Sequence, residues 1–364
     1  MIGRVCRVKM SKYNPKKFLH VEDIKISRAT AKLLDEATEV YNKNFDNKTW
    51  FGRCLFLSWY CSRATCKFCF RATRNHQKRF AKKYRRSMEG LLLEALFCRI
   101  FNWRIEFLTG GYDIYDFKEL IETIKSIKLV YGEKIWINLG TFDESQLKQL
   151  KPYVKGVCAS IETANPILHK KVCPDKPIRP FSDMLRQAKR LGFETSAAFI
   201  VGLGEKPEDI EHLFKFIEKH NLDRITVYAL KPVAGTVFTT PPSSDEYLQW
   251  LAKIRINFPK LEIMAGTNLR RSEEVGYYMR AGVNAITKYP ASKQFATKKS
   301  MLVERLIKSE KRDFTSNLTK LPKINWHKEI DKLRINRQLK EKMELKIDSY
   351  LNGFKNPKDE DKEI

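Results

Sequence analysis

The sequence has no uninterrupted apolar run of the roughly 18 residues that a membrane-spanning helix needs. Its first residues, MIGRVCRVKMSKYNPKK, lack the apolar segment of a secretory signal. We therefore expect a cytoplasmic protein without a membrane partner. Thiols stay reduced in that compartment, so the eight cysteines are not expected to pair as disulfides.

Acidic residues are few relative to basic ones. The chain has 43 Asp and Glu against 69 Lys and Arg, for a net charge of +26. Residues 71–86, RATRNHQKRFAKKYRR, contain no acid at all. Such an excess is compatible with a polyanionic partner, but a lysine-rich, solvated surface gives the same composition. We favour the second interpretation and do not expect nucleic acid as a partner.

Segments typical of strands alternate with segments of helical period, which indicates a parallel α/β fold. Eight strands over about 240 residues fit a closed (β/α)8 TIM-type barrel, with a doubly wound open sheet as the alternative. The expected strands are residues 54–60, 104–110, 134–140, 154–162, 195–204, 224–230, 261–267 and 284–289. The expected helices between them are residues 87–102, 116–130, 143–150, 178–191, 206–220, 243–258 and 272–281.

Three regions are expected along the chain. Residues 1–50 form an N-terminal helical lead-in, and residues 51–297 form the barrel. Residues 298–364 form a basic helical extension, with helices near 301–312 and 325–351 and a disordered tail. In such a barrel, functional residues lie at the C-terminal ends of the strands.

Three cysteines directly follow the first expected strand. Cys61, Cys66 and Cys69 have the spacing C-x4-C-x2-C, within LSWYCSRATCKFCFRATR. Structural zinc needs four ligands, for which Cys54 or His76 would have to serve, and the sequence has no second C-x2-C. A [4Fe–4S] cluster normally takes four thiolates, so three leave one iron open to a small chelating molecule. S-adenosylmethionine (SAM) is such a chelator, and together with the cluster it supports radical chemistry.

With Phe68 before Cys69 and two residues between the last two cysteines, the chain resembles the radical SAM superfamily. Its first cysteine gap has four residues, where the usual signature has three. The segments SIETANPILHKKVCPDK, GFETSAAFIVGLGEKPEDI and AGTNLRRSEEVGYYMRAGVNAI resemble the biotin synthase and hydrogenase-maturase branch. Within residues 50–297 the chain is most similar to the methanogen group associated with the iron-guanylylpyridinol cofactor of iron-only hydrogenase.

The resemblance implies an enzyme that holds a [4Fe–4S] cluster on the three cysteines and cleaves SAM reductively. The resulting 5′-deoxyadenosyl radical would abstract hydrogen from a small-molecule substrate inside the barrel, with ferredoxin or flavodoxin as electron donor. Biotin synthase itself is disfavoured, because residues 104–110, 134–140 and 195–204 contain no cysteine for a second cluster.

The resemblance also implies contacts with SAM. The glycine pair would bind its amino group through the backbone, strand residues would contact its ribose, amino-acid part and adenine, and an arginine would pair with its carboxylate. The residues at these positions, together with the signature aromatic, are Phe68, Thr109, Gly110, Gly111, Ser160, Glu162, Arg179, Ile200, Val201 and Gly202.

Several of these residues also have a purely structural explanation that involves no contact with SAM. The glycine pair can serve a strand-to-helix turn, Glu162 can form a buried ion pair, and an apolar strand run is ordinarily core. Cys158 shares strand parity with Ser160 and is expected inside the barrel, as a buried apolar thiol.

Three alternatives to the main functional hypothesis stay open. One is a hydrogenase maturase or methylornithine-synthase-like mutase of the same branch. Another is a zinc-dependent nucleic-acid-binding protein, and the third is a radical SAM enzyme that acts on RNA.

Overall fold

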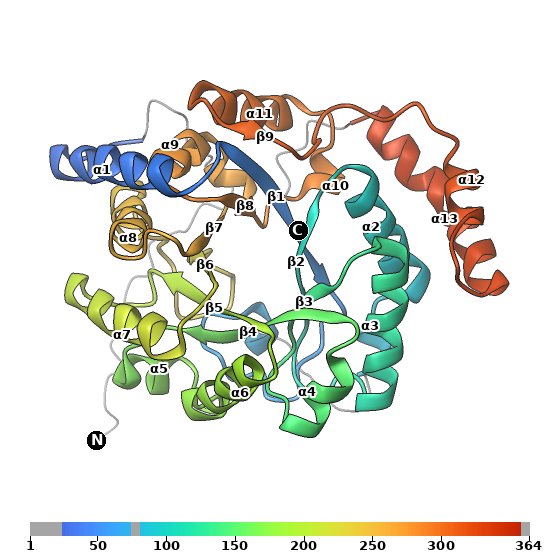
Figure 1. Ribbon diagram of the computed structural model, residues 1–364, viewed down its shortest axis with the longest axis horizontal. Coiled ribbons are helices and arrows are strands. Elements are labelled where there is room, and N and C mark those ends of the chain that lie inside the picture. Colours follow the sequence, from blue (N-terminus) through green and yellow to red (C-terminus); the bar gives the residue numbers. More distant parts are fainter. Residues whose placement is uncertain (1–23, 74–80, 358–364) are drawn as a thin grey trace, which may run out of the picture.

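The computed structural model describes residues 24–73 and 81–357. Eight parallel strands close into a barrel, because each strand pairs with the next and the eighth pairs with the first (Figure 1). This confirms the expected (β/α)8 class. The strands are β1 (Lys48–Phe56), β2 (Arg104–Thr109), β3 (Ile135–Asn138), β4 (Val154–Glu162), β5 (Glu194–Val201), β6 (Arg224–Ala229), β7 (Glu262–Gly266) and β8 (Ala285–Thr287).

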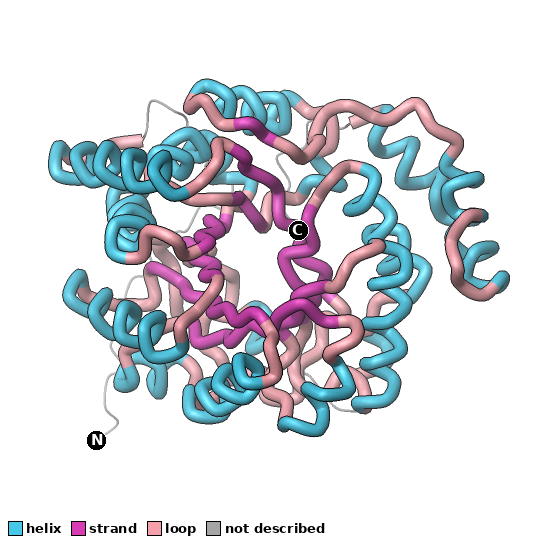
Figure 2. The backbone as a smooth tube through the Cα atoms, viewed as in Figure 1, coloured by secondary structure: helices cyan, strands magenta, loops and turns pink. Residues whose placement is uncertain are grey.

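Helices surround the strands on the outside (Figure 2). Their apolar faces and the outward-facing strand residues share one large core. All seven expected helices are present, and α5 is an additional short helix that starts at a proline after the capping residue Asn165. The helices of the barrel are α2 (Met88–Ile100), α3 (Phe117–Tyr131), α4 (Glu144–Leu150), α5 (Pro166–Val172), α6 (Ile178–Arg190), α7 (Ile210–His220), α8 (Ser244–Asn257) and α9 (Val275–Arg280).

The first strand differs most from its expected range. It begins at Lys48 rather than at residue 54 and ends at Phe56. Gly52 and Arg53 interrupt the apolar pattern, so the pattern did not predict the first half of the strand. Arg53 is accommodated on the outer side by a 2.8 Å ion pair with Glu94 of α2.

Segments before and after the barrel pack on its outside (Figure 1). Helix α1 (Arg28–Asn44) packs against α8 and α9, and residues 1–23 lie outside the described part of the chain. After the barrel, α13 packs against α2, and β9 adds a short parallel strand to β1. The expected helix at 325–351 is in fact two helices. The elements after the barrel are α10 (Ala291–Gln294), α11 (Lys298–Ser309), β9 (Asp313–Phe314), α12 (Trp326–Asp331) and α13 (Arg337–Lys355).

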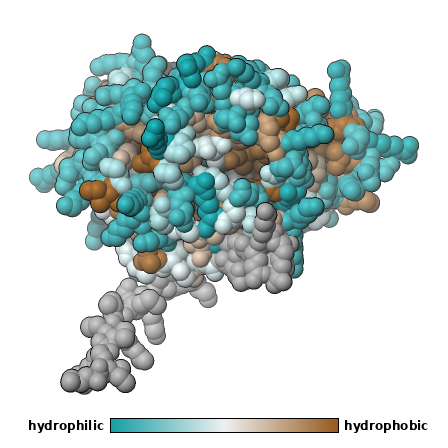
Figure 3. All heavy atoms as spheres, turned by 90° about the horizontal axis from the view of Figure 1, so that it is seen from below, coloured by the Kyte–Doolittle hydropathy of each residue, from teal (hydrophilic) through white to brown (hydrophobic). Residues whose placement is uncertain are grey.

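The surface shown in Figure 3 is largely hydrophilic, with scattered hydrophobic side chains. Among the described residues, no helix is long and apolar enough to span a membrane. The tail residues 358–364 lie outside the described part of the chain.

Candidate functional site

The three signature cysteines lie on the loop that leaves the C-terminal end of β1. The loop stays attached to β2, because the Leu57 N–H donates to the Thr109 carbonyl at 2.8 Å. A turn then forms where the Cys69 N–H donates to the Cys66 carbonyl at 3.0 Å. All three thiols are unpaired and partly exposed, at the end of the barrel where function is expected.

Two backbone N–H groups approach one of these sulfurs. The N–H groups of Ala64 and Tyr112 donate to Cys61 Sγ at 3.5 and 3.4 Å. Hydrogen bonds of this kind stabilise thiolates and tune iron–sulfur clusters. Burial raises the pKa of the Cys69 thiol, and the nearby Arg71 only partly opposes this effect. Within the part of the chain that the structure describes, no group of three or more Cys, His, Asp or Glu side chains is arranged to hold a metal ion. The assignment of a cluster to these three cysteines therefore stays a proposal, based on their spacing and on the single loop that carries them.

The glycine pair after β2 lies directly behind Cys61. A Cβ atom on Gly111 would stand 2.1 Å from the Tyr60 carbonyl oxygen and 2.4 Å from Cys61 Cβ. Only glycine permits this approach of two backbones. The structure thus brings Thr109, Gly110 and Gly111 to the cysteine loop, and their contact with SAM stays a prediction.

At the end of β4, the structure shows the buried ion pair that was the simpler explanation of Glu162. Lys176 Nζ lies 2.5 Å from Glu162 Oε1, and both side chains are largely buried. Burial alone would lower the pKa of Lys176, but the Glu162 carboxylate raises it overall. A register shift separates Glu162 from Ser160, and Ser160 donates instead to Asn138 Oδ1 at 2.5 Å.

A fourth cysteine, Cys173, is buried beside the site. Its side chain hydrogen-bonds to Cys66, and this contact, although burial opposes it, lowers the pKa of the Cys66 thiol to about 7. The Lys67 N–H also donates to the Val172 carbonyl at 2.9 Å, so the end of α5 is docked on the cysteine loop. The segment 160–176 carried a family resemblance, but no spacing rule linked Cys173 to Cys66.

An apolar cluster joins the cysteine loop to β5. Phe68 and Cys66 pack against Ile200 and Cys173 in this cluster. Val201 belongs instead to the main core between strands and helices, so the structure does not bring its side chain to the site. Gly202 has a φ of +105° and turns the chain after β5.

Arg179 lies on the surface of α6. Its side chain is 92% exposed on α6 and lies 3.9 Å from Asp183 of the same helix. The structure does not bring it to the cysteines. The proline on either side gave its alignment with the family little support, and an exposed helix position explains the residue.

The basic run at 71–86 is partly engaged within the protein. Arg71 donates to the Ser58 carbonyl, Arg85 to Glu119, and Arg86 pairs with Glu94. Residues 74–80, including His76, lie outside the described part of the chain. Arg71, Arg85 and Arg86 thus hold the segment after the cysteines against Ser58, α3 and α2, whereas Lys82 and Lys83 are exposed.

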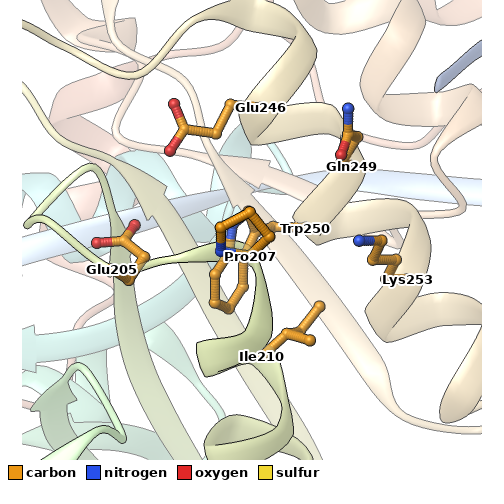
Figure 4. A pocket seen from close by; sticks show the side chains of 7 residues that line it. All are labelled: Glu205, Pro207, Ile210, Glu246, Gln249, Trp250 and Lys253. Carbon is orange, nitrogen blue, oxygen red and sulfur yellow. The ribbon is translucent and has the colours of Figure 1, made fainter. Parts of the chain in front are cut away.

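A small hollow lies between the start of α7 and helix α8 (Figure 4). Trp250, in its wall, stacks on Phe199, which belongs to the main core on the outer side of β5. The hollow is therefore outside the barrel wall. Glu205, at its edge, accepts a hydrogen bond from the Gly202 N–H and so fixes the turn after β5. The lining residues are Glu205, Pro207, Ile210, Glu246, Gln249, Trp250 and Lys253.

The barrel interior contains Cys158, as expected from its strand parity. It packs with residues of β1, β2, β3 and β5, namely Cys54, Phe107, Trp136 and Ala198. Burial raises the pKa of the Cys158 thiol well above its usual range. This is the environment of an inert apolar thiol.

Residues 58–217 match the family model of the radical SAM superfamily. An uncharacterized protein of Methanocaldococcus jannaschii is 33% identical over 334 residues, which are 87% of this chain and 92% of that protein. The [FeFe] hydrogenase maturase subunit HydE of Thermotoga maritima is 27% identical over 280 residues, 74% of this chain and 78% of that protein. The chain belongs to the radical SAM superfamily.

Among solved structures, methylornithine synthase is similar with a TM-score of 0.65 at 21% identity, over 74% of this chain and 82% of that one. This likeness supports the fold alone. Membership of the superfamily implies an enzyme that uses a [4Fe–4S] cluster and SAM.

Proposed function

We propose that this protein is a radical SAM enzyme in which Cys61, Cys66 and Cys69 hold a [4Fe–4S] cluster. The cluster, when bound, supplies the electron that cleaves SAM to methionine and a 5′-deoxyadenosyl radical. The observation that carries the proposal is the presence of three thiols on one loop at the C-terminal end of β1, in a chain whose residues 58–217 match the radical SAM family model.

The surrounding residues would bind SAM and exclude water. The backbone around Gly110 and Gly111 lies against Cys61, where it would accept the amino-acid part of SAM. Phe68 and Ile200 provide an apolar surface next to Cys66, suited to the adenine. Ser160 and Glu162 lie on the neighbouring strand end, and Glu162 is already held by Lys176.

For the reaction itself, we propose a step in the biosynthesis of the iron-guanylylpyridinol cofactor of iron-only hydrogenase. The support is the sequence similarity of residues 50–297 to that group, together with the four-residue first cysteine gap. A maturase or mutase of the same branch remains the alternative. We further propose a small reduced ferredoxin or flavodoxin as the electron donor.

Anaerobic reconstitution with iron and sulfide tests the proposal. The reconstituted protein should absorb near 400 nm, and after addition of a reductant it should form 5′-deoxyadenosine from SAM. Each of Cys61→Ala, Cys66→Ala and Cys69→Ala should lose this product to the detection limit. Cys98→Ala, which changes a buried thiol in α2, is the matched control and should keep it.

A colourless protein that holds zinc and binds RNA with a steep salt dependence would contradict the enzyme assignment. The finer assignment is tested in the cell. Deletion of the gene should abolish the guanylylpyridinol cofactor while leaving the hydrogenase polypeptide present.

A further inference from the structure

Lys288 follows β8 directly, at the end of the barrel where the cysteine loop lies. Its backbone has a φ of +64°, the left-handed region that residues with a side chain rarely adopt. Strain of this kind persists where the surrounding structure holds a residue in place, and it gathers at functional sites.

The inner wall of the barrel is partly accessible around Lys288. Phe56, Tyr228 and Lys288 are partly exposed, whereas Cys54 and Glu106 beneath them are buried. Phe56 and Tyr228 pack against the cluster of side chains inside the barrel. Phe56 ends β1, Tyr228 is the second-last residue of β6 and Lys288 directly follows β8, so these partly exposed side chains lie at the C-terminal end of the barrel.

The hydrogen-bond donors of Lys288 are mostly unused. Its Nζ donates to Cys54 Sγ at 3.3 Å, and sulfur is a weak acceptor. The rings of Phe56, Tyr228 and Phe107 lie 4.7, 5.2 and 5.8 Å from Nζ. An ammonium group has three N–H donors, so two have no oxygen or nitrogen acceptor among the described residues.

The nearest buried acid does not take up these donors. Glu106 Oε1 accepts from the Tyr228 hydroxyl at 2.5 Å, and its Oε2 accepts from the Thr287 hydroxyl. Within residues 24–73 and 81–357, no carboxylate oxygen forms an ion pair with Lys288 at 4.0 Å or less. Another donor in the same interior cluster, the indole N–H of Trp136, also has no acceptor in the described part of the chain.

The ring of Phe56 connects this group to the cysteine loop. Lys288 lies on Phe56 at 4.7 Å, and the Arg71 guanidinium lies 5.8 Å from the same ring. Arg71 lies two residues after Cys69 on the same loop. Lys288 and Arg71 thus lie near the same ring, and Arg71 belongs to the loop that carries the cysteines.

We propose that Lys288 anchors the anionic group, a carboxylate or a phosphate, of the small-molecule substrate. The rings of Phe56, Phe107 and Tyr228 enclose the adjoining apolar part, and the free N–H donors of Lys288 receive the oxyanion. This inference rests on the proposed function, since it assigns the substrate class of that site.

Binding is measured by anaerobic calorimetry on the full-length protein reconstituted with iron and sulfide. The probes are benzoate, its neutral isostere benzamide, and inorganic phosphate. Wild-type protein should bind benzoate or phosphate at least about tenfold more tightly than benzamide, a difference of about 1.4 kcal/mol. Preference for benzoate would identify a carboxylate, and preference for phosphate a phosphate.

Lys288→Met should bind benzoate no better than benzamide, and Lys288→Gln serves in its place if that variant does not fold. Lys125→Met, on the exposed face of α3, is the matched control and should keep the preference. The proposal is overturned if neither anion binds the wild type at millimolar concentration, or if Lys288→Met retains the preference.

Urea unfolding of the same variants separates an anchor from a structural charge. If Lys288 serves to bind substrate and has no ion-pair partner, its replacement removes no stabilising contact of this kind. The urea midpoint of Lys288→Met should then be equal to that of the wild type or higher. A clearly lowered midpoint would mean that Lys288 stabilises Glu106, and would overturn the proposal. The binding and unfolding assays do not depend on SAM cleavage. The anion-binding proposal can therefore fail while the cysteine variants still support the proposed function. Equally, anion binding can be found even if SAM cleavage is not.

Discussion

The Cys173 side chain hydrogen-bonds to the Cys66 thiol, although 107 positions of sequence separate them. Cys173 lies immediately after α5, and the Cys66 loop is docked there through the Lys67 N–H and the Val172 carbonyl. The contact places a spare thiol against a proposed cluster ligand.

When the cluster is absent, a two-electron oxidant such as diamide should join Cys66 to Cys173, because the thiols already touch. The two thiols lose two electrons and two protons, which the diamide takes up. Differential alkylation and mass spectrometry of the cluster-free protein should find this disulfide. Cys173→Ala should leave Cys66 free to alkylation. Recovery of Cys66 as a free thiol in the oxidised wild type would contradict the prediction.

Gly111→Ala should prevent cluster assembly. The new methyl group would meet backbone atoms, the Tyr60 carbonyl oxygen at 2.1 Å and Cys61 Cα at 2.5 Å, which cannot move without displacing the loop. Iron and sulfide analysis after reconstitution should fall from about four irons per chain to background. Gly353→Ala, in helix α13 with no atom within 4 Å, is the control and should retain the iron.

Lys176→Met should destabilise the fold by about 3–5 kcal/mol, because it leaves the buried Glu162 carboxylate without its partner. The double variant with Glu162→Gln should lose less than the sum of the single changes, since neither buried charge then remains. Urea unfolding of the four proteins measures this coupling. Additive losses would show that the two side chains do not interact.

Stability should fall as pH decreases from about 6.5 towards about 4. Burial, with Lys219 and Arg186 nearby, lowers the pKa of His220 from 6.5 to about 4. Over this range the unfolded chain binds a proton that the folded chain does not, so acid favours unfolding by at most about 1.4 kcal/mol per pH unit. His220→Gln should reduce the slope of unfolding free energy against pH. An unchanged slope would mean that His220 does not contribute.

The sequence was sufficient for the architecture, and it singled out the three cysteines proposed as cluster ligands. Strand and helix patterns are local and repeat eight times, so errors at single ends, such as the early start of β1, leave the barrel intact. The three cysteines lie within nine residues, and their spacing alone indicates a common role. Gly110 and Gly111 were singled out as well, because a glycine pair after a strand has a recognisable pattern, and their contact with SAM stays a prediction.

The tertiary structure decided which distant residues meet. Cys173 reaches Cys66 only because α5 packs on the cysteine loop, and Arg179 points to solvent because of its face on α6. Lys288 reaches Cys54 and Phe56 because barrel closure pairs β8 with β1. Such contacts depend on how the strands and helices pack in three dimensions. The spacing of residues along the chain does not show which distant residues meet.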